Sequence, residues 1–225
     1  MLYRLLAVSF FVKLFGSYII SIYYCTKDTK IVHIILMNIR DRIVRVAKQR
    51  FLKNGFYKVS MDSLVKELRT SKSSVYNHFS SKDELVKAVI DLLNIEINSK
   101  LRNVLDDDKL SFKGKLISIS EFTKDLLTNV SDTFLKDLEI NTPDLWDYYQ
   151  KTRMERINKY YRRLFEIGID EGMIRNDLNM EIILLVYLNL MELPLKAENI
   201  EFVKMYNQNI YEETTDVFLN GILKM

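Results

Sequence analysis

The residues between 71 and 82 combine small polar, basic and aromatic side chains at helical spacing. If residues 71–79 form a helix, Val75 and Phe79 face inward and the polar side chains face solvent. Small serines let such a helix approach a major groove closely, while Lys72 can hydrogen-bond guanine and Asn77 can hydrogen-bond adenine. This chemistry predicts sequence-specific contacts to double-stranded DNA.

The same stretch offers contacts to the sugar-phosphate backbone. Tyr76 and His78 suit phosphate and sugar contacts, which set the register of a protein on DNA without reading bases. Lys82 stands in the first turn of a following helix, where its charge and the free amides attract a phosphate, and Ser60 stands at a similar helix start. The predicted DNA-contact residues are Ser60, Lys72, Ser73, Ser74, Tyr76, Asn77, His78 and Lys82.

Four helices are predicted to position these side chains. Apolar residues recur every four positions in the first, and the second, of about two turns, ends at a short turn containing Arg69. Ser81 and Glu84 form a capping box that opens a long fourth helix. Two short helices joined by a three- to four-residue turn have the geometry of a helix-turn-helix. The predicted capping residues of the four helices are Asn38, Ser60, Ser71 and Ser81.

Charge is distributed unevenly along the 225 residues. Residues 38–82 hold eleven Lys and Arg against three Asp and Glu, a net charge of +8, whereas residues 83–225 carry a net charge of −8. A small basic block joined to a larger acidic one is typical of a polyanion-binding module attached to a body that does not bind polyanions.

The run from 60 to 85 resembles the signature of the TetR family of transcriptional regulators. That pattern has Thr or Ser opening the second helix, a V-S-x-x-x-L-Y-x-H-F recognition helix, and S-K-E-x-L opening the fourth helix. The resemblance implies an N-terminal DNA-binding domain, a variable C-terminal ligand-sensing domain, and a homodimer paired through its last two helices. The residues that carry it are Ala47, Phe51, Gly55, Ser60, Tyr76, His78, Phe79, Lys82 and Leu85, with Val75 and Asp83 as close substitutes.

Arg69 departs from the family pattern, which usually has glycine at this position. The turn needs a left-handed backbone conformation, in which a side chain costs about 1 kcal/mol. We therefore expect a slightly strained turn before the recognition helix.

Composition favours an all-α protein. Only 6 Gly and 2 Pro interrupt a chain with 48% hydrophobic residues, which favours long helices around a large core. Cys25 is the single cysteine, and His33 and His78 lie far apart, so neither a disulfide framework nor a metal site is predicted. Because no catalytic signature follows Leu85, we predict no enzyme activity, no catalytic residues and no cofactor. A reducing, cytoplasmic and nucleoid-associated location fits this composition.

Residues 1–37 differ from the rest, because Leu5 to Tyr24 contains a single charge, Lys13. A run of 20 such residues can span a bilayer. Three explanations are open: an upstream start that the cell does not use, with Met37 as the true start; a membrane anchor, which would tether the protein; or a packed soluble extension. The predicted division is a leader at 1–37, a DNA-binding domain at 38–84, and a ligand-sensing and dimerisation domain at 85–225.

The larger half carries the predicted ligand and dimer sites. Pockets between helices are mostly apolar with a few polar anchors, although each candidate also fits ordinary core packing. The predicted pocket residues are Phe122, Leu126, Phe134, Trp146, Tyr149 and Met154. Residues 180–193 are apolar nearly all around, which predicts a helix buried on two sides. The predicted dimer-interface residues, with packing within one chain as the alternative, are Leu184, Tyr187, Leu188, Met191, Ile210, Val217 and Phe218.

Together these features predict a ligand-responsive repressor that binds a near-palindromic operator as a C2 dimer. Its partners are an operator duplex, a second copy of the chain and an unidentified small-molecule effector. The alternative is a helical lipid-binding or membrane-associated protein whose basic end contacts anionic membrane, and the apolar run in the leader is its main support.

Overall fold

The computed structural model describes residues 38–130, 132–192 and 210–223. Over these ranges the chain is helical, apart from an isolated β-bridge between Ile174 and Leu223. The predicted all-α fold is therefore confirmed. None of the helices in these ranges is long and apolar enough to cross a membrane. The predictions for residues 1–37 lie outside the described ranges.

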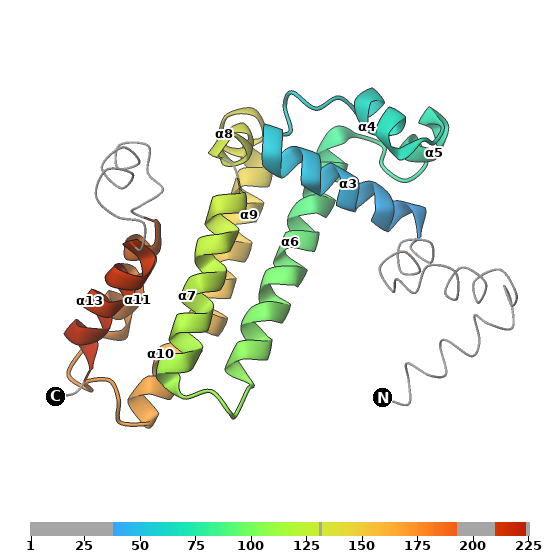
Figure 1. Ribbon diagram of the computed structural model, residues 1–225. Coiled ribbons are helices and arrows are strands. Elements are labelled where there is room, and N and C mark those ends of the chain that lie inside the picture. The colour runs from blue at the N-terminus through green and yellow to red at the C-terminus, as the bar shows by residue number, and fades with distance from the viewer. Residues whose placement is uncertain (1–37, 131, 193–209, 224–225) are drawn as a thin grey trace, which may run out of the picture.

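The helices form a small N-terminal group and a larger bundle (Figure 1). α3, α4 and α5 gather at one end, and α6 leads from them into the bundle beside α7 and α9, while α11 and α13 pair on the side away from α5. The described helices, in chain order, are α3 (Ile39–Asn54), α4 (Met61–Leu68), α5 (Lys72–Tyr76), α6 (Lys82–Leu105), α7 (Phe112–Asn129), α8 (Asp132–Asn141), α9 (Pro143–Arg156), the π-helical η1 (Ile157–Tyr161), α10 (Arg162–Asp170), α11 (Met180–Glu192) and α13 (Ile210–Ile222).

All four predicted capping residues cap their helices. Asn38 Oδ1 accepts the Arg40 amide hydrogen at 3.0 Å. Three serine hydroxyls each accept the amide hydrogen three residues ahead at 3.1 Å, namely those of Ser60, Ser71 and Ser81. The return bond of the predicted capping box is displaced by one residue, because the Glu84 carboxylate accepts from the amide and hydroxyl of Ser80, which precedes the cap Ser81. These two hydrogen bonds lower the pKa of Glu84.

The core of the N-terminal group is built as the apolar spacing predicts. Val75 and Phe79 are fully buried, in one cluster with Ile43 and Phe51 of α3. The guanidinium carbon of Arg40 lies 5.0 Å from the centre of the Phe79 ring, so a cation covers the outer side of this core. Burial of Val75 and Phe79 fixes which face of α5 points to solvent.

The turn after α4 has the predicted left-handed conformation. Arg69 has φ 51° and ψ 46°, the one positive φ at a non-glycine residue in the described ranges. Its amide donates to the Lys66 carbonyl at 3.2 Å, and Arg42 Nη2 donates to the Leu68 carbonyl at 2.9 Å. The end of α4 thus keeps its hydrogen bonds, which hold Arg69 in a conformation that it does not favour.

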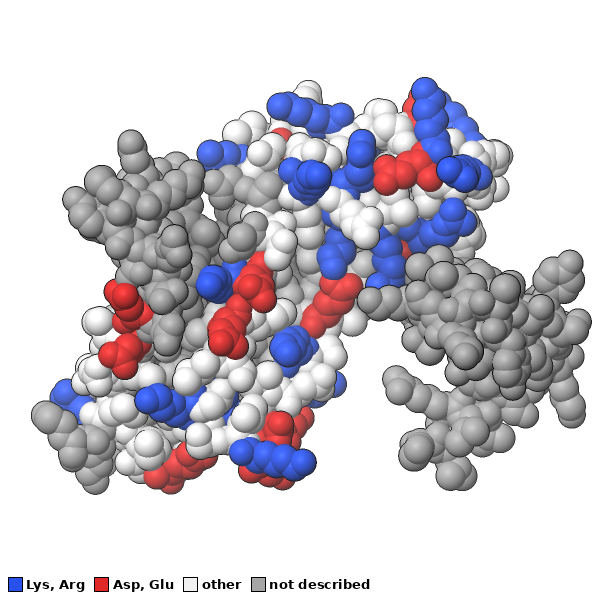
Figure 2. All heavy atoms as spheres, viewed as in Figure 1, with Lys and Arg blue, Asp and Glu red and all other residues white. Residues whose placement is uncertain are grey.

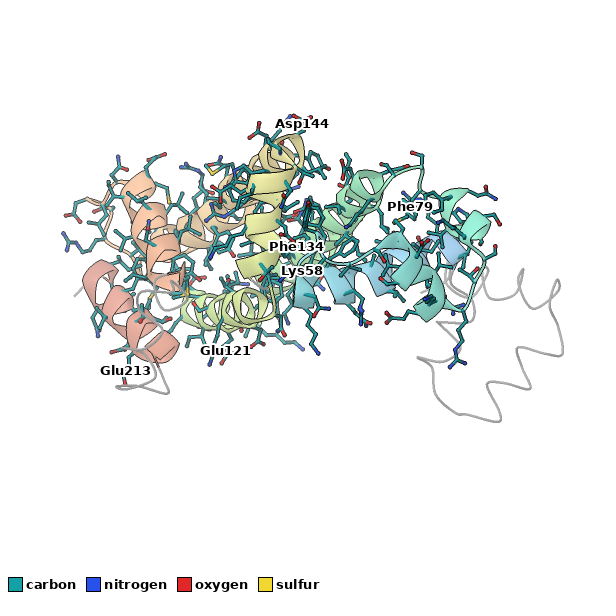
Figure 3. All side chains as sticks on the ribbon, turned by 90° about the horizontal axis from the view of Figure 1, so that it is seen from above. Lys58, Phe79, Glu121, Phe134, Asp144 and Glu213 are labelled. Carbon is teal, nitrogen blue, oxygen red and sulfur yellow. The ribbon has the colours of Figure 1, made fainter. Side chains whose placement is uncertain are left out.

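An aromatic junction joins the N-terminal group to the bundle. The Phe56 ring packs edge-on against Phe51, with 6.2 Å between ring centres, and against Phe134 of α8, at 6.1 Å. Figure 3 shows Phe134 between the end marked by Phe79 and the α13 end marked by Glu213. Phe134, predicted to line a ligand pocket, is fully buried in this junction instead, because it fills the space beside Phe56.

The backbone at this junction is held by an acid of α8. Asp137 Oδ2 accepts the amide hydrogen of Tyr57 at 2.9 Å. Gly55 has φ 74°, and a Cβ there would lie 2.4 Å from the same carboxylate oxygen and 2.6 Å from Thr133 Cγ2. Only glycine therefore lets the chain pass this close to α8.

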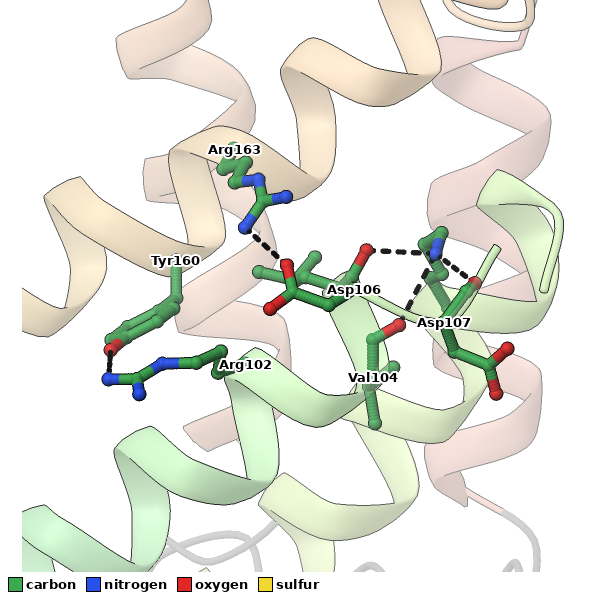
Figure 4. A network of polar contacts seen from close by, with 8 residues as sticks. Arg102, Val104, Asp106, Asp107, Tyr160 and Arg163 are labelled. Atoms are coloured by element: carbon green, nitrogen blue, oxygen red, sulfur yellow. Dashed lines mark hydrogen bonds and ion pairs between the residues drawn. The ribbon is translucent and has the colours of Figure 1, made fainter. Parts of the chain in front are cut away.

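The far end of α6 is closed by a buried lysine from α7. Lys115 is 4% exposed, and its Nζ donates to the carbonyls of Val104 at 3.3 Å, Leu105 at 2.9 Å and Asp107 at 2.5 Å (Figure 4). The last carbonyls of a helix lack partners within the helix, and they carry partial negative charge. The ammonium group donates hydrogen bonds to these carbonyls, and its positive charge offsets their partial negative charge.

Replacing Arg69 with glycine tests the strain in the turn. We expect Arg69→Gly to raise the free energy of unfolding by up to about 1 kcal/mol, because glycine adopts positive φ without steric cost. Urea unfolding of the full chain measures the change. Arg69→Ala is the control, since it removes the guanidinium but keeps the strained conformation; an equal gain in both variants would contradict the strain explanation.

Replacing Lys115 with methionine tests the cap of α6. We expect Lys115→Met to lower the free energy of unfolding by about 2–3 kcal/mol, because buried carbonyls lose a charged donor. Lys113→Met, at an exposed position of α7, is the matched control and should change stability by less than about 0.5 kcal/mol. If both substitutions changed the free energy of unfolding equally, the contacts of Lys115 with the carbonyls would not stabilise the protein.

Candidate nucleic-acid interface

α5 is a short helix held at the end of the molecule by its buried side. Regular helix ends at Tyr76, earlier than the predicted Phe79. Helical hydrogen bonding nevertheless continues, since the Asn77 amide donates to the Ser73 carbonyl at 2.9 Å and the Phe79 amide donates to the Val75 carbonyl at 3.0 Å. The side chains of the following turn therefore keep helical spacing.

The outer face of α5 is polar and accessible. Lys72, Ser73 and Asn77 are exposed, and Tyr76 is 40% exposed although it is aromatic. Exposed aromatic and small polar side chains on one helical face suit contact with a groove. Ser74 and His78 are half-buried at the edge of this face. The structure thus brings six of the predicted contact residues onto one surface, and their contacts with DNA stay a prediction.

Lys72 has a partner that the sequence did not reveal. Its Nζ lies 2.8 Å from Asp62 Oδ1 of α4 and 5.7 Å from the Tyr76 ring centre. Hydrogen bonding and charge attraction from Asp62 raise the pKa of Lys72. Both side chains of the pair are more than 60% exposed, so the pair contributes little to stability and a phosphate or base can displace the acid at low cost. Asp62 lies in the first turn of α4, and its contact with Lys72 depends on how α4 packs against α5.

Lys82 contacts residues of the aromatic junction and also lies beside the α5 surface. Its Nζ donates to the Tyr57 carbonyl at 3.0 Å and lies 5.9 Å from the ring centres of both Phe56 and Tyr57. Burial lowers the pKa of Lys82. The carbonyl takes one of the three donors of the ammonium group, so the predicted phosphate contact needs only the other two.

Ser60 and the surrounding charge complete this surface. The Ser60 hydroxyl oxygen already accepts the Ser63 amide, so in the structure this residue is first a helix cap. Its predicted phosphate contact is not tested by the structure. Figure 2 shows Lys and Arg side chains gathered over the end formed by α3, α4 and α5, which agrees with the basic balance of residues 38–82.

Comparison with known proteins identifies the family. Residues 43–89 match the model of bacterial regulatory proteins of the tetR family, and this span includes α4, α5 and the start of α6. The HTH-type transcriptional regulator QacR of Staphylococcus aureus is 26% identical over 204 residues, which cover 84% of this chain and all of QacR. Residues 43–89 therefore form a helix-turn-helix domain of the tetR family. The predicted resemblance is therefore confirmed, and the chain is a helix-turn-helix transcriptional regulator rather than an enzyme.

Other relatives of this chain agree on the domain or on the fold. UidR of Escherichia coli is 39% identical over 51 residues, which are 23% of this chain and 26% of UidR. A TetR transcriptional regulator from Legionella pneumophila has a TM-score of 0.62 at 21% identity, covering 84% of this chain and 99% of that one. One from Chloroflexus aurantiacus has a TM-score of 0.65 at 17% identity, covering 83% and 96%. These two solved structures show a shared fold over both domains.

The predicted pocket residues lie in different surroundings. Phe134 lies in the junction, and Trp146 stacks on Tyr149 with 5.9 Å between ring centres. Met154 is 50% exposed, while Phe122 and Leu126 pack partly buried against the core. None of the six lines the groove between α6 and α9 or the groove between α7 and α13. Their role in ligand binding stays a prediction, with ordinary packing as the stated alternative.

Four of the predicted dimer-interface residues lie inside the protomer: Leu184, Tyr187, Met191 and Phe218. The Tyr187 ring contacts Phe165, at 5.3 Å between centres, and Phe218, at 5.5 Å, and its hydroxyl lies 3.0 Å from that of Ser120. Full burial raises the pKa of Tyr187. These residues pack within one chain, which was the stated alternative, so they are not available to a partner.

A different face of the same helices is open. Ile182, Leu185 and Val186 of α11 are 56%, 58% and 42% exposed, and Val217 of α13 is 69% exposed. Of the predicted interface, Val217 thus remains accessible and Leu188 is partly buried. The side chain of Ile210 lies outside the described part of the chain.

Proposed function

We propose that this chain is a ligand-responsive repressor that binds a near-palindromic operator as a homodimer. The observation that carries the DNA contact is the outer face of α5, where exposed Lys72, Ser73, Tyr76 and Asn77 stand over a fully buried Val75. A dimer related by a two-fold axis would present two such faces to major-groove half-sites about 34–36 Å apart.

The open face of α11 supports the dimer. An exposed strip of large apolar side chains on a soluble domain marks an interaction surface. In Figure 1, α11 and α13 lie on the side of the bundle away from α5, so pairing through them leaves both recognition helices free. We propose Ile182, Leu185, Val186 and Val217 as the centre of the interface, with Leu188 beside them.

The junction supports ligand response. Asp137 and Phe134 of α8 hold the backbone and ring of residues 56 and 57, while Lys82 of α6 holds the Tyr57 carbonyl. A ligand that shifts α6 relative to α8 would change the orientation of α5. It would do so only if it binds the two arrangements with different affinity.

Selection of binding sites from random duplexes tests DNA recognition. We expect the dimer to enrich a near-palindrome, with affinity falling steeply as salt rises. Asn77→Ala should weaken binding by about 1–3 kcal/mol and relax specificity at a position occupied by adenine. Lys109→Ala, at an exposed lysine after α6, is the control and should bind as the unchanged protein does.

Two results would overturn the DNA-binding proposal. One is enrichment of no sequence above the starting pool. The other is equal retention on the selected duplex, scrambled DNA and anionic lipid vesicles, which is what the membrane-associated alternative predicts. The family comparisons favour the regulator over that alternative.

A charge on α11 tests the dimer. We expect Leu185→Glu to weaken self-association by about 2 kcal/mol or more, roughly 30-fold in the dimer Kd, because a carboxylate would be buried in an apolar interface. Sedimentation velocity across a concentration series measures it. Ile140→Glu, at a 73% exposed position of α8, is the matched control. Dimers of unchanged strength in Leu185→Glu would place the interface elsewhere.

A further inference from the structure

A polar groove lies between α6 and the helix that continues from α9 into η1. Its volume is about 500 Å³, and α6 contributes Asn94 and Asn98 while the facing helix contributes Thr152, Arg156 and Tyr160. The groove belongs to the bundle and is distinct from the α5 surface. It has the size of a small-molecule site.

The most buried charge in this groove is the Arg156 guanidinium, which has no carboxylate partner among the described residues. Arg156 is only 7% exposed, and its Nη1 donates to Asn94 Oδ1 at 2.8 Å. No carboxylate among the described residues pairs with it. Burial, together with the like charge of Arg153, lowers the pKa of Arg156. A buried cation without a counter-charge is costly, so an anion that reaches it gains strongly.

Asn98 adds an unmet acceptor to the same groove. Its Oδ1 is buried and accepts no hydrogen bond from the described residues. Asn98 stands one helical turn after Asn94, which is about 6 Å along α6. A buried acceptor without a donor costs free energy until a ligand supplies one.

The other charges of the groove are already engaged or lie at its edge. Asp91 accepts from the Tyr148 hydroxyl at 2.5 Å and from Lys87 Nζ at 3.3 Å. Glu155 and Lys159 are exposed and of opposite sign. Arg156 is therefore the charge that the interior of the groove presents to a ligand.

A π-helical turn shapes this wall of the groove. η1 begins directly after Arg156 and contains Tyr160, whose hydroxyl accepts from Arg102 Nη2 at 3.5 Å (Figure 4). An isolated π turn inside a helix costs stability and occurs often where a helix carries a binding site. Here the turn lies where the helix faces α6 across the groove.

We propose that the groove binds a small organic carboxylate that also carries a hydrogen-bond donor away from its acid group. The carboxylate pairs with the Arg156 guanidinium, and the donor reaches Asn98 Oδ1. This inference names the effector class and rests on the proposed function for its biological role.

Calorimetric titration of the full chain, without DNA, tests the site. The probe is 4-hydroxyphenylacetate, which carries a carboxylate at one end and a hydroxyl donor at the other, and its neutral amide is the matched compound. We expect the acid to bind at least about tenfold more tightly than the amide. We expect a similar loss of acid binding in Arg156→Met, and also in Asn98→Asp, which places a negative charge beside the site. Arg163→Met, outside the groove and paired with Asp106, is the control and should bind normally.

Stability separates a binding role of Arg156 from a structural one. If the buried charge serves a ligand, Arg156→Met without ligand unfolds at the same or a higher denaturant concentration, because the cost of burying the charge is removed. Equal binding of acid and amide, unchanged binding in Arg156→Met, binding of inorganic phosphate without the acid, or no acid binding at millimolar concentration would each overturn the proposal. None of these results depends on an operator, so the site and DNA recognition fail or succeed separately.

Discussion

The position of the recognition helix depends on how the peptide groups of Tyr57 are held. Its amide hydrogen is bound by Asp137 of α8, and its carbonyl is bound by Lys82 of α6. The adjacent Phe56 ring is fixed between Phe51 and Phe134. The N-terminal group therefore follows the two bundle helices that hold this residue and that also pack against α3. The outer side chains of α5 take no part in this attachment, so they can be exposed and polar.

Local features of the fold could be predicted from the sequence because their causes lie within four residues. The caps at Ser60, Ser71 and Ser81 and the buried positions Val75 and Phe79 are of this kind, whereas the left-handed turn at Arg69 was expected from the family resemblance. Each depends on a hydrogen bond or a periodicity inside one helix. The exposed face of α5 follows directly, which is why the candidate contact residues could be chosen before the fold was known.

Features that depend on packing between distant helices could not be predicted in the same way. Residues 180–193 are apolar on nearly every side, so no periodicity distinguishes the inner side of Leu184 and Tyr187 from the outer side of Leu185. An aromatic residue such as Phe134 fits a pocket and a packed junction equally well until its neighbours are known. The buried state of Arg156 has no sequence signal either, because arginine is ordinarily exposed. At these positions the sequence alone does not predict the surroundings that the structure shows.

The π turn at Ile157–Tyr161 also bears on how such a regulator can diverge. A π turn accommodates one extra residue. The residues after it therefore lie about 100° from the positions that an unbroken α-helix of the same sequence would give them. The residues before η1 that face α6 and the residues of α10 that enter the core are therefore set in different registers, although one continuous helix carries both. A one-residue deletion that converts this turn to regular α-helix leaves Leu164 and Phe165 in the core, and substitutions of the groove-facing residues before the turn alter the groove wall. Under the proposed function, effector preference can change by point substitution along α9 while the helices proposed to pair and the end proposed to contact DNA keep their sequence.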